Sequence, residues 1–373
     1  MSKLILIVVF AIVSCISESA LAQAPSAAVR PSAAVTTIEM PVYQPRFGRT
    51  RPVVAVIGEN TFTELTDYVI PYAVMTESGV AEVFALATES GPIQMFPALQ
   101  IEPRATSAEF DARFPDGADY VIVPAVHYTK DPILLAWVTA QATKGATIIG
   151  VCDGVWVLAN AGLLKNRRAT GHWYSFSSLE KQFSETIWVK DRRYVADRNV
   201  ITTTGVTASL PVSLALVEAI AGRDRTETVA KALGVADWSP AHHSEIFRLN
   251  RRHIFTAASN WLSFWSHETV GIPVTQGTDE IALALAADAY SRTYRSRAVS
   301  VAQSPNVIRT KRGLNLFPDH VTEASKPPDR MLSIAEASSL DRTLESIAQT
   351  YGRATAAFVA LQLESPDLQH FIP

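Results

Sequence analysis

The stretch that most constrains the fold is residues 146–164, where a buried-strand pattern runs directly into a helix pattern. Residues 146–151 are apolar and rich in β-branched side chains, which is typical of a strand covered on both faces. Residues 155–164 have the pattern of a helix. Cys152 and Asp153 lie at the junction. A sharp strand-to-helix turn presents its first residue at the carboxyl end of the strand, which is how α/β sheets display nucleophiles.

The thiol of Cys152 is expected to favour its ionised form, because the amino terminus of the following helix supplies free N–H groups and partial positive charge. The chain has two cysteines, Cys15 and Cys152, and Cys15 falls in a targeting segment. A mature exported protein with one cysteine cannot use it for an internal disulfide. A buried, inert thiol is the alternative, since free cysteines are often core residues.

The targeting segment is at the amino terminus. Lys3 precedes an apolar run over residues 4–13, and a small-residue site ending at Ala22 follows. A run of about ten residues is too short to span a bilayer, which takes about 20. We expect cleavage after Ala22 and a periplasmic or extracellular protein. The residues before Cys15 also resemble a lipoprotein cleavage box, so a lipid anchor at Cys15 is the alternative.

The remainder divides into three parts. Residues 23–51 are rich in Pro, Ala, Ser and Thr and are expected to form a linker. Residues 52–222 alternate strand and helix patterns with short connections, which predicts a parallel sheet with helices on both faces. Sites on such sheets lie beyond the carboxyl ends of the strands. Strands are predicted at residues 52–58, 81–87, 119–124 and 194–204, and helices at 61–78, 131–144 and 207–221.

Residues 223–373 have a different texture and are predicted to form an α/β or mostly helical extension. It could cap the pocket, replace a dimer contact or form a separate domain; we favour a cap or an accessory α/β layer. Residues 251–267 carry an aromatic face, interpreted as internal packing, with a partner or membrane contact as the alternative. Further elements are predicted as helices at residues 226–233, 279–294 and 339–364 and a strand at 298–302.

Charge excludes one class of partner. The formal net charge is −3 over 373 residues, so nothing indicates a nucleic-acid surface. We find no helix-turn-helix pattern and no internal repeat. His242, His243 and Glu245 suggest a metal site, but their spacing fits no familiar zinc set and no third ligand is evident, so we predict no metal.

Three blocks together resemble the ThiJ/PfpI family of the class I glutamine amidotransferase-like superfamily. They are Val-Cys-Asp-Gly at residues 151–154, Leu-Ala-Asn-Ala-Gly-Leu-Leu at 158–164 and Arg-Arg-Ala-Thr-Gly-His-Trp at 167–173. The resemblance covers about residues 51–222. It is nearest to isocyanide-hydratase-like members and to the amidotransferase-like domains of AraC-type regulators. It implies a flavodoxin-like three-layer α/β sandwich with Cys152 as the nucleophile on a strained elbow.

The resemblance also implies partners for the sulfur. Asp67 occupies the place of an acid that contacts the cysteine in many members, and a carboxyl group beside a thiolate should be protonated and donate to it. Glu64, one turn earlier, is the alternate acid. His172 stands where many members keep a histidine that serves as general base or orients the site. The alternatives are exposed helix charges for Asp67 and Glu64 and a structural histidine for His172.

The oxyanion donors implied by the resemblance are the backbone N–H groups of Asp153 and Val126. Two departures bear on them. Members usually have Pro-Gly-Gly where this chain has Pro124-Ala125-Val126, and Ala and Val resist positive φ, so a different loop path is expected. The Asp153 carboxylate should raise the thiol pKa. His127 could offset Asp153 or contact a ligand, with an ordinary loop histidine as the alternative.

Two functions follow. The first is an exported cysteine-dependent hydrolase or hydratase of a small electrophilic molecule, working through Cys152 without a cofactor. The second is a non-catalytic ligand-binding or redox-sensing module, since an exposed low-pKa thiol is readily oxidised. In both the partner is a small molecule rather than nucleic acid. The resemblance leaves a homodimer open.

Overall fold

The computed structural model describes residues 40–372 apart from residues 324–325 and 334. The predicted signal segment, the cleavage site after Ala22, Cys15 and most of the predicted linker lie outside these residues. The described residues fall within one compact unit. None of their helices is long and apolar enough to cross a membrane.

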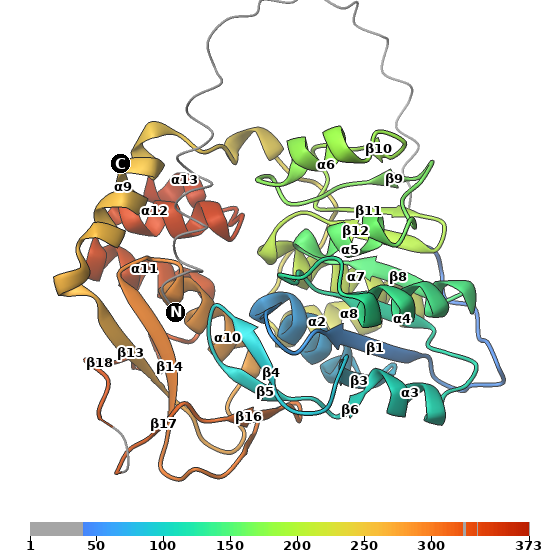
Figure 1. Ribbon diagram of the computed structural model, residues 1–373, viewed down its shortest axis with the longest axis horizontal. Coiled ribbons are helices and arrows are strands. Elements are labelled where there is room, and N and C mark those ends of the chain that lie inside the picture. Colours follow the sequence, from blue (N-terminus) through green and yellow to red (C-terminus); the bar gives the residue numbers. More distant parts are fainter. Residues whose placement is uncertain (1–39, 324–325, 334, 373) are drawn as a thin grey trace, which may run out of the picture. The chain divides into compact units, whose positions relative to one another are not determined.

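A seven-stranded sheet runs through residues 53–203 and is parallel except for the edge pair β11–β12 (Figure 1). The strand patterns of the sequence predicted this parallel sheet, and the structure confirms it. In spatial order the strands are β11 (Tyr194–Asp197), β12 (Val200–Thr203), β8 (Thr147–Gly150), β7 (Tyr120–Val123), β1 (Val53–Gly58), β3 (Glu82–Ala87) and β6 (Ala105–Thr106).

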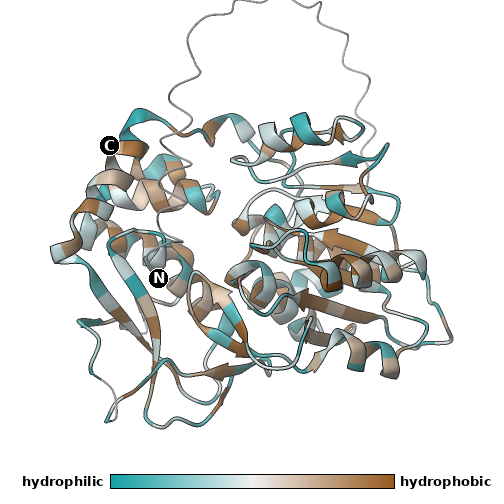
Figure 2. Cartoon of the chain, viewed as in Figure 1, coloured by the Kyte–Doolittle hydropathy of each residue, from teal (hydrophilic) through white to brown (hydrophobic). Residues whose placement is uncertain are grey.

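Helices cover both faces of this sheet, because alternate residues of each strand point to opposite sides. Val54 and Val56 of β1 belong to one apolar core, and Val53, Ala55 and Ile57 belong to another. The result is the predicted three-layer α/β sandwich, with β1 among the predominantly hydrophobic elements (Figure 2). The first core contains α2 (Leu65–Ser78) and α7 (Ser209–Ala221); the second contains α3 (Ser107–Arg113), α4 (Pro132–Thr143) and α5 (Val155–Asn160).

The extension is α/β, within the range predicted for it. Its four-stranded sheet is parallel and has the order β17-β14-β13-β18. The strands are β13 (Glu268–Pro273), β14 (Ser296–Ala302), β17 (His320–Val321) and β18 (Arg330–Met331). The helices are α8 (Arg223–Ala232), α9 (Arg251–Leu262), α10 (Glu280–Ser291), α11 (Leu340–Tyr351), α12 (Arg353–Gln362) and α13 (Leu368–Phe371).

Three local predictions were wrong. The predicted helix over 339–364 is two helices, because Gly352 adopts φ 91° between α11 and α12. The first helix begins at Leu65 rather than residue 61, since Thr63–Glu64 form the short strand β2. The aromatic face does not pack internally: Phe255, Phe264 and Trp265 are more than 70% exposed.

Two contacts between the extension and the first part of the chain bear most on the site. Strand β16 (Asn315–Phe317) pairs antiparallel with β5 (Gln100–Glu102), so a five-stranded sheet combines both parts in the order β15-β16-β5-β4-β2. Its other strands are β15 (Ile308–Arg309) and β4 (Ile93–Phe96). Helix α10 packs against α2. This second contact brings the end of α10 toward the carboxyl edge of the main sheet.

Candidate functional site

Cys152 lies on a strained turn between β8 and α5, as the sequence predicted. Its φ is 54°, in the left-handed region that residues with a Cβ rarely adopt. The Cys152 N–H donates to Thr203 Oγ1 at 2.9 Å, which ties the elbow to the end of β12. A Cβ on Gly154 would lie 2.1 Å from the carbonyl oxygen of Val123, so only glycine lets the turn approach β7 this closely.

The electrostatics of Cys152 differ from the prediction that its thiolate is favoured. The residue is buried, with 6% of its surface exposed. Burial raises the pKa of the Cys152 thiol, and the carboxylates of Asp67, Asp153 and Glu64 raise it further, whereas a hydrogen bond from the Asp153 N–H lowers it. The helix amino terminus is outweighed, and the protonated thiol is the favoured form at rest.

Asp67 is buried beside this thiol and not on a solvent-exposed helix face. Its Oδ2 accepts from the Ala125 N–H at 3.2 Å, and its Oδ1 accepts from the Ser209 hydroxyl at 3.5 Å. Burial raises the pKa of Asp67 from 3.8 to about 7, and the hydrogen bond from Ala125 opposes this. No hydrogen bond of the described residues joins Asp67 to the sulfur, so their interaction is electrostatic.

Glu64 is also buried, at the start of α2, where its Oε2 accepts from the Asp67 N–H at 2.8 Å and from the Thr66 hydroxyl at 2.9 Å. Burial raises the pKa of Glu64 well above its usual range, with Asp288 and Asp67 adding to the effect and Arg292 opposing it. Glu64 and Asp67 therefore form one acidic cluster around the elbow.

Arg292, directly after α10, is the cation of this cluster. Its Nη2 lies 2.7 Å from Glu64 Oε1 and its Nε lies 2.5 Å from Asp288 Oδ1, with 15% of the side chain exposed. Burial tends to lower the pKa of Arg292, but Asp288 and Glu64 outweigh it and raise that pKa, and the Cys152 sulfur adds to the rise. A residue of the extension thus enters the electrostatic environment of the thiol.

His172 is not placed as a base for Cys152. Its Nε2 lies 3.3 Å from the Gln362 carbonyl oxygen, and no hydrogen bond in the described part of the chain joins it to the sulfur. Its electrostatic partner is Asp153, whose pKa is raised by burial and lowered by His172 and by the Ser175 hydroxyl, which donates at 2.9 Å. The other Asp153 oxygen, Oδ1, is buried and makes no close hydrogen bond in the described part of the chain, and an interaction with Trp156 also lowers the pKa of Asp153.

The loop after β7 has a backbone that suits its side chains. Neither Ala125 nor Val126 has a positive φ. Val126 instead faces Thr63 in an antiparallel bridge, held by Glu64 N–H to Ala125 O at 2.8 Å and by the neighbouring bond to Phe62. In such a non-hydrogen-bonded pair the N–H of Val126 points away from the partner strand. That N–H has no partner among the described residues, as an oxyanion donor requires.

His127 does not reach the site. It is exposed, and its ring contacts Phe62 and Tyr128 at centroid distances of 5.8 and 5.0 Å. The ordinary loop histidine was therefore the correct alternative for this residue.

The residues first considered for a metal have other roles. His242 Nε2 lies 2.9 Å from Oε1 of Glu364, whose Oε2 accepts from the Gly205 N–H. The main-chain oxygen of Glu364 accepts from the Thr207 hydroxyl at 2.7 Å. Across the described residues no three His, Cys, Asp or Glu side chains are arranged to hold a metal ion. Glu364 instead fixes the loop that follows β12.

Sequence reasoning missed Arg292, Asp288 and Glu364. Asp288 and Arg292 stand four residues apart on an otherwise Ala- and Leu-rich helix, and Asp288 is fully buried. A charged pair at that spacing on an apolar helix was the available signal. Nothing in the sequence indicated that the pair would face Glu64.

A model of the DJ-1/PfpI family matches residues 53–219. The chain is 29% identical over 174 residues to isonitrile hydratase of Pseudomonas putida, covering 46% of this chain and 73% of the hydratase. It is 35% identical over 86 residues to the HTH-type transcriptional regulator CdhR of Pseudomonas aeruginosa, covering 23% of this chain and 25% of the regulator. The crystal structure of Drosophila melanogaster DJ-1beta matches at 23% identity with a TM-score of 0.45, over 50% of this chain and 100% of that one.

Proposed function

Residues 53–219 belong to the DJ-1/PfpI family, and from that premise we propose that the protein is a cysteine-dependent hydratase or hydrolase of a small electrophilic molecule. The observation that carries the proposal is the elbow itself. Cys152 is held at φ 54° within the electrostatic reach of a carboxyl group, Asp67, whose pKa is about 7, and the loop after β7 leaves the Val126 N–H without a partner among the described residues. We infer that a nucleophile, a proton carrier and an anion-binding N–H act together at this site.

Because the raised pKa keeps the Cys152 thiol protonated at rest, the first step of the reaction requires both Cys152 and Asp67. The carboxylate of Asp67 accepts the proton of the Cys152 thiol as the sulfur attacks, so the thiolate exists only during reaction. A carboxyl group with a pKa near the working pH is suited to accept and return a proton. Arg292 limits the build-up of negative charge by pairing with Glu64 at 2.7 Å.

An isocyanide, R–N≡C, illustrates the balance of atoms. The sulfur bonds to the terminal carbon, and the proton taken by Asp67 is delivered to that carbon, giving a thioimidate, S–CH=N–R. Water then adds to the carbon as the C–S bond breaks. One water proton passes through Asp67 to the sulfur and the other ends on nitrogen, releasing the formamide R–NH–CHO and the thiol. The N–H groups of Val126 and Asp153 would hold the negative charge that develops in between.

The substrate class rests on the relative. Isonitrile hydratase is named for this reaction and aligns with 46% of this chain at 29% identity. The buried acid at Asp67 favours hydration or hydrolysis, because both need a proton moved on and off one centre. Small aldehydes and amides contain the same kind of electrophilic carbon and belong in the same screen.

The test is turnover by purified protein and two variants, Cys152→Ser and Asp67→Asn, with an aryl isocyanide, methylglyoxal and a simple amide as substrates. We expect turnover of at least one substrate, its loss in Cys152→Ser, and a fall of about 100-fold in Asp67→Asn. Asp224→Asn, an exposed aspartate at the start of α8, is the matched control and should keep full activity. Turnover retained by Cys152→Ser would exclude the mechanism.

The burial and raised pKa of Cys152 disfavour a resident thiolate and so favour a second candidate, a non-catalytic ligand-binding module. The same features slow oxidation of the thiol, so they weigh against the redox-sensing form of this module. The module requires no turnover. It predicts saturable binding of a small molecule near Asp153, or, in its redox-sensing form, oxidation of Cys152 to its sulfenic acid by peroxide. Turnover that depends on Cys152 decides for the enzyme, whereas ligand binding or oxidation without turnover decides for the module.

We also propose that the protein is exported after removal of residues 1–22, with lipidation at Cys15 as the alternative. Intact mass measurement of the protein from fractionated cells distinguishes these outcomes. A mature chain that begins at Gln23 supports export in soluble form. A lipid-modified chain that begins at Cys15 supports the anchor, and an uncut cytoplasmic chain contradicts both.

A further inference from the structure

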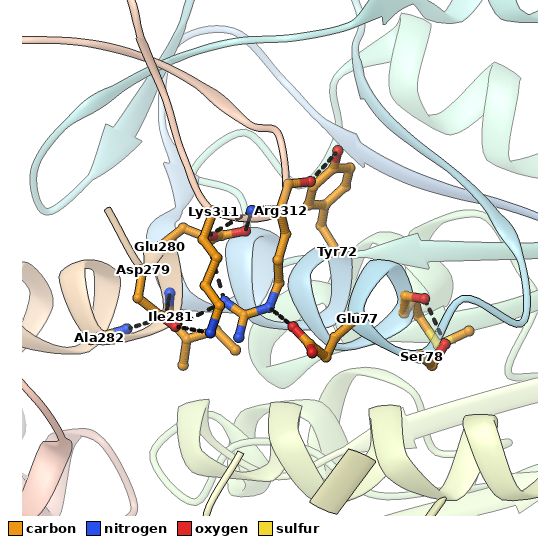
Figure 3. A network of polar contacts seen from close by, with 10 residues as sticks. Tyr72, Glu77, Ser78, Asp279, Glu280, Ile281, Ala282, Lys311 and Arg312 are labelled. Carbon is orange, nitrogen blue, oxygen red and sulfur yellow. Dashed lines mark hydrogen bonds and ion pairs between the residues drawn. The ribbon is translucent and has the colours of Figure 1, made fainter. Parts of the chain in front are cut away.

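A second polar centre lies at the opposite end of the helix pair that forms the cysteine site. Arg312, just before β16, reaches Glu77 near the end of α2 with Nε–Oε2 at 2.7 Å (Figure 3). Its Nη1 lies 3.1 Å from Asp279 and 3.5 Å from Glu280, which begin α10. Helices α2 and α10 therefore run antiparallel, and Arg312 joins their distal ends.

Beside Arg312 is a cavity of about 520 Å³ between α2, β3 and the β15–β16 hairpin. This volume is in the range that proteins use for small-molecule ligands. Both parts of the chain form its walls, since the hairpin belongs to the extension and the remaining walls to residues 51–104. Its polar lining includes Arg51, Arg104, Arg309, Arg312, Tyr72 and Thr76.

The acidic groups of this cavity already have partners. Glu82 pairs with Arg113 at 2.6 Å, and Glu102 accepts from the Asn315 side chain at 2.8 Å. Arg312 is likewise paired within the protein, with Glu77, Asp279 and Glu280. Glu82 is therefore paired with a cation, whereas Glu102 has only a neutral amide donor, and neither carboxylate forms an ion pair with Arg51, Arg104 or Arg309 in the described part of the chain.

Three arginines that line the cavity form no ion pair with a described residue. Arg51 donates to the Ala81 carbonyl oxygen at 2.5 Å, and Arg104 contacts the Val83 carbonyl oxygen at 3.5 Å and the ring of Phe84. The guanidinium of Arg309 has no hydrogen bond or ion pair with any described residue. None of the three has a carboxylate partner within the described chain, so an anion in the cavity would meet guanidinium groups that are free to bind it.

Two hydroxyl groups complete the lining. The Oγ1 atom of Thr76 is buried and makes no close hydrogen bond in the described part of the chain, although it interacts with the Tyr72 hydroxyl. The Tyr72 hydroxyl also has a 3.4 Å contact with the Arg312 carbonyl oxygen. Hydroxyl groups held this loosely on a cavity wall can donate to, or accept from, a bound group or water.

We propose that this cavity binds a small anion with two or more negative charges, carried on phosphate or carboxylate oxygens, with Arg104 and Arg309 as the main charged contacts and Thr76 and Tyr72 as hydroxyl contacts. Arginine suits either group because its planar N–H pairs match two oxygens at once. Since the walls come from residues 51–104 and from the β15–β16 hairpin, the site requires the extension and is separate from Cys152.

Isothermal titration of the full-length protein with inorganic phosphate, glucose 6-phosphate and citrate tests the proposal. We expect saturable binding of at least one of these anions. Preference for glucose 6-phosphate identifies a phosphorylated ligand, and preference for citrate identifies a polycarboxylate. Absence of saturable binding for all three overturns the proposal.

The double variant Arg104→Gln/Arg309→Gln should weaken that binding more than tenfold, because each charge-assisted hydrogen bond contributes about 1.5–3 kcal/mol. Arg251→Gln/Arg252→Gln removes the same charge from two exposed positions of α9 and should bind normally. Equal affinity in the two double variants overturns the assignment. If the cavity variant does not fold, Arg309→Gln and the near-isosteric Thr76→Val decide, and each should bind several-fold more weakly than wild type.

Discussion

The side chains around Cys152 share too few positive charges for all of them to ionise together. The carboxyl groups of Glu64, Asp67 and Asp153 act on the thiol, Asp288 acts on Glu64 and Asp67, and Arg292 is the cation paired with Glu64 and Asp288. Like charges in a buried site cannot all persist, so protons are shared among the carboxyl groups and the sulfur. The charge state of Cys152 is consequently a property of the cluster and not of the helix amino terminus alone.

Because the pKa of Asp67 is raised in the folded protein, we expect the stability of the protein to depend on pH. The pKa of Asp67 in the folded protein is about 7 against an ordinary 3.8, so folding favours the protonated form. The stabilising contribution is complete below pH 3.8 and is lost as pH rises through 7. Because asparagine cannot ionise, Asp67→Asn does not lose this stability as the pH rises. We expect the free energy of unfolding of Asp67→Asn, relative to that of wild type, to be about 3–4 kcal/mol more favourable at pH 8 than at pH 4.

Urea unfolding of both proteins at those two pH values measures the difference. Asp224→Asn, on the exposed first turn of α8, should show no comparable pH-dependent change. A constant difference between Asp67→Asn and wild type across this range would mean that Asp67 is ionised in the folded protein.

The same substitution should change the reactivity of the sulfur. Because the Asp67 carboxylate raises the pKa of Cys152, its neutral replacement should lower that pKa. We expect the midpoint of iodoacetamide alkylation against pH to fall in Asp67→Asn. Alkylation followed by intact mass gives the midpoint, and Cys152→Ser supplies the blank. An unchanged or higher midpoint would place Asp67 outside the electrostatic reach of the thiol.

Among the elements, the elbow depends on how closely α5 approaches β7. A Cβ on Gly154 would lie 2.1 Å from one backbone carbonyl and 2.9 Å from the next, and neither can move without disturbing the sheet. We expect Gly154→Ala to lower the free energy of unfolding by about 3 kcal/mol or more. Gly162, at φ 74° with nothing within 4 Å of its would-be Cβ, is the control, and Gly162→Ala should lose about 1 kcal/mol. Denaturant unfolding of both variants measures the two losses. Equal losses would show that the close backbone contact at Gly154 does not determine the loss of stability.

The sequence was most informative where pattern and element coincide. The β8 pattern and the parallel sheet followed from apolar runs bounded by helix patterns, and Cys152 followed from its place between them. Short strands were missed. Thr63–Glu64 lie within a helical pattern, yet they pair with β4 and the loop at Val126, because a tertiary partner outweighed local propensity. The break at Gly352 was signalled by its residue type and should have divided the last predicted helix.

At the scale of the whole molecule, the approach of Asp288 and Arg292 to Glu64 could not have been predicted. Arg292 and Glu64 are 228 positions apart, and no periodicity links residues at that separation. The pairing of β16 with β5 and the packing of α10 on α2 bring them together. The extension therefore contributes charge to the cysteine site, whereas the sequence indicated only an α/β or mostly helical extension, with a cap or an accessory layer favoured.

This long-range contact makes Arg292 a test of how strongly the two parts depend on each other. Arg292→Met keeps most of the side-chain volume but leaves Glu64 and Asp288 without their cation in a buried site. Removal of one partner of a buried pair destabilises by about 3–5 kcal/mol, and we expect a loss of that size. Adding Glu64→Gln to Arg292→Met should recover part of it, because one unpaired carboxylate is removed.

Arg342→Met breaks an exposed pair with Glu345 and should lose at most about 1 kcal/mol. Urea unfolding of the three variants and wild type at pH 8, where the carboxylates are most ionised, supplies the comparison. If Arg292→Met and Arg342→Met lost the same amount, the extension would pack on the site without governing its charge.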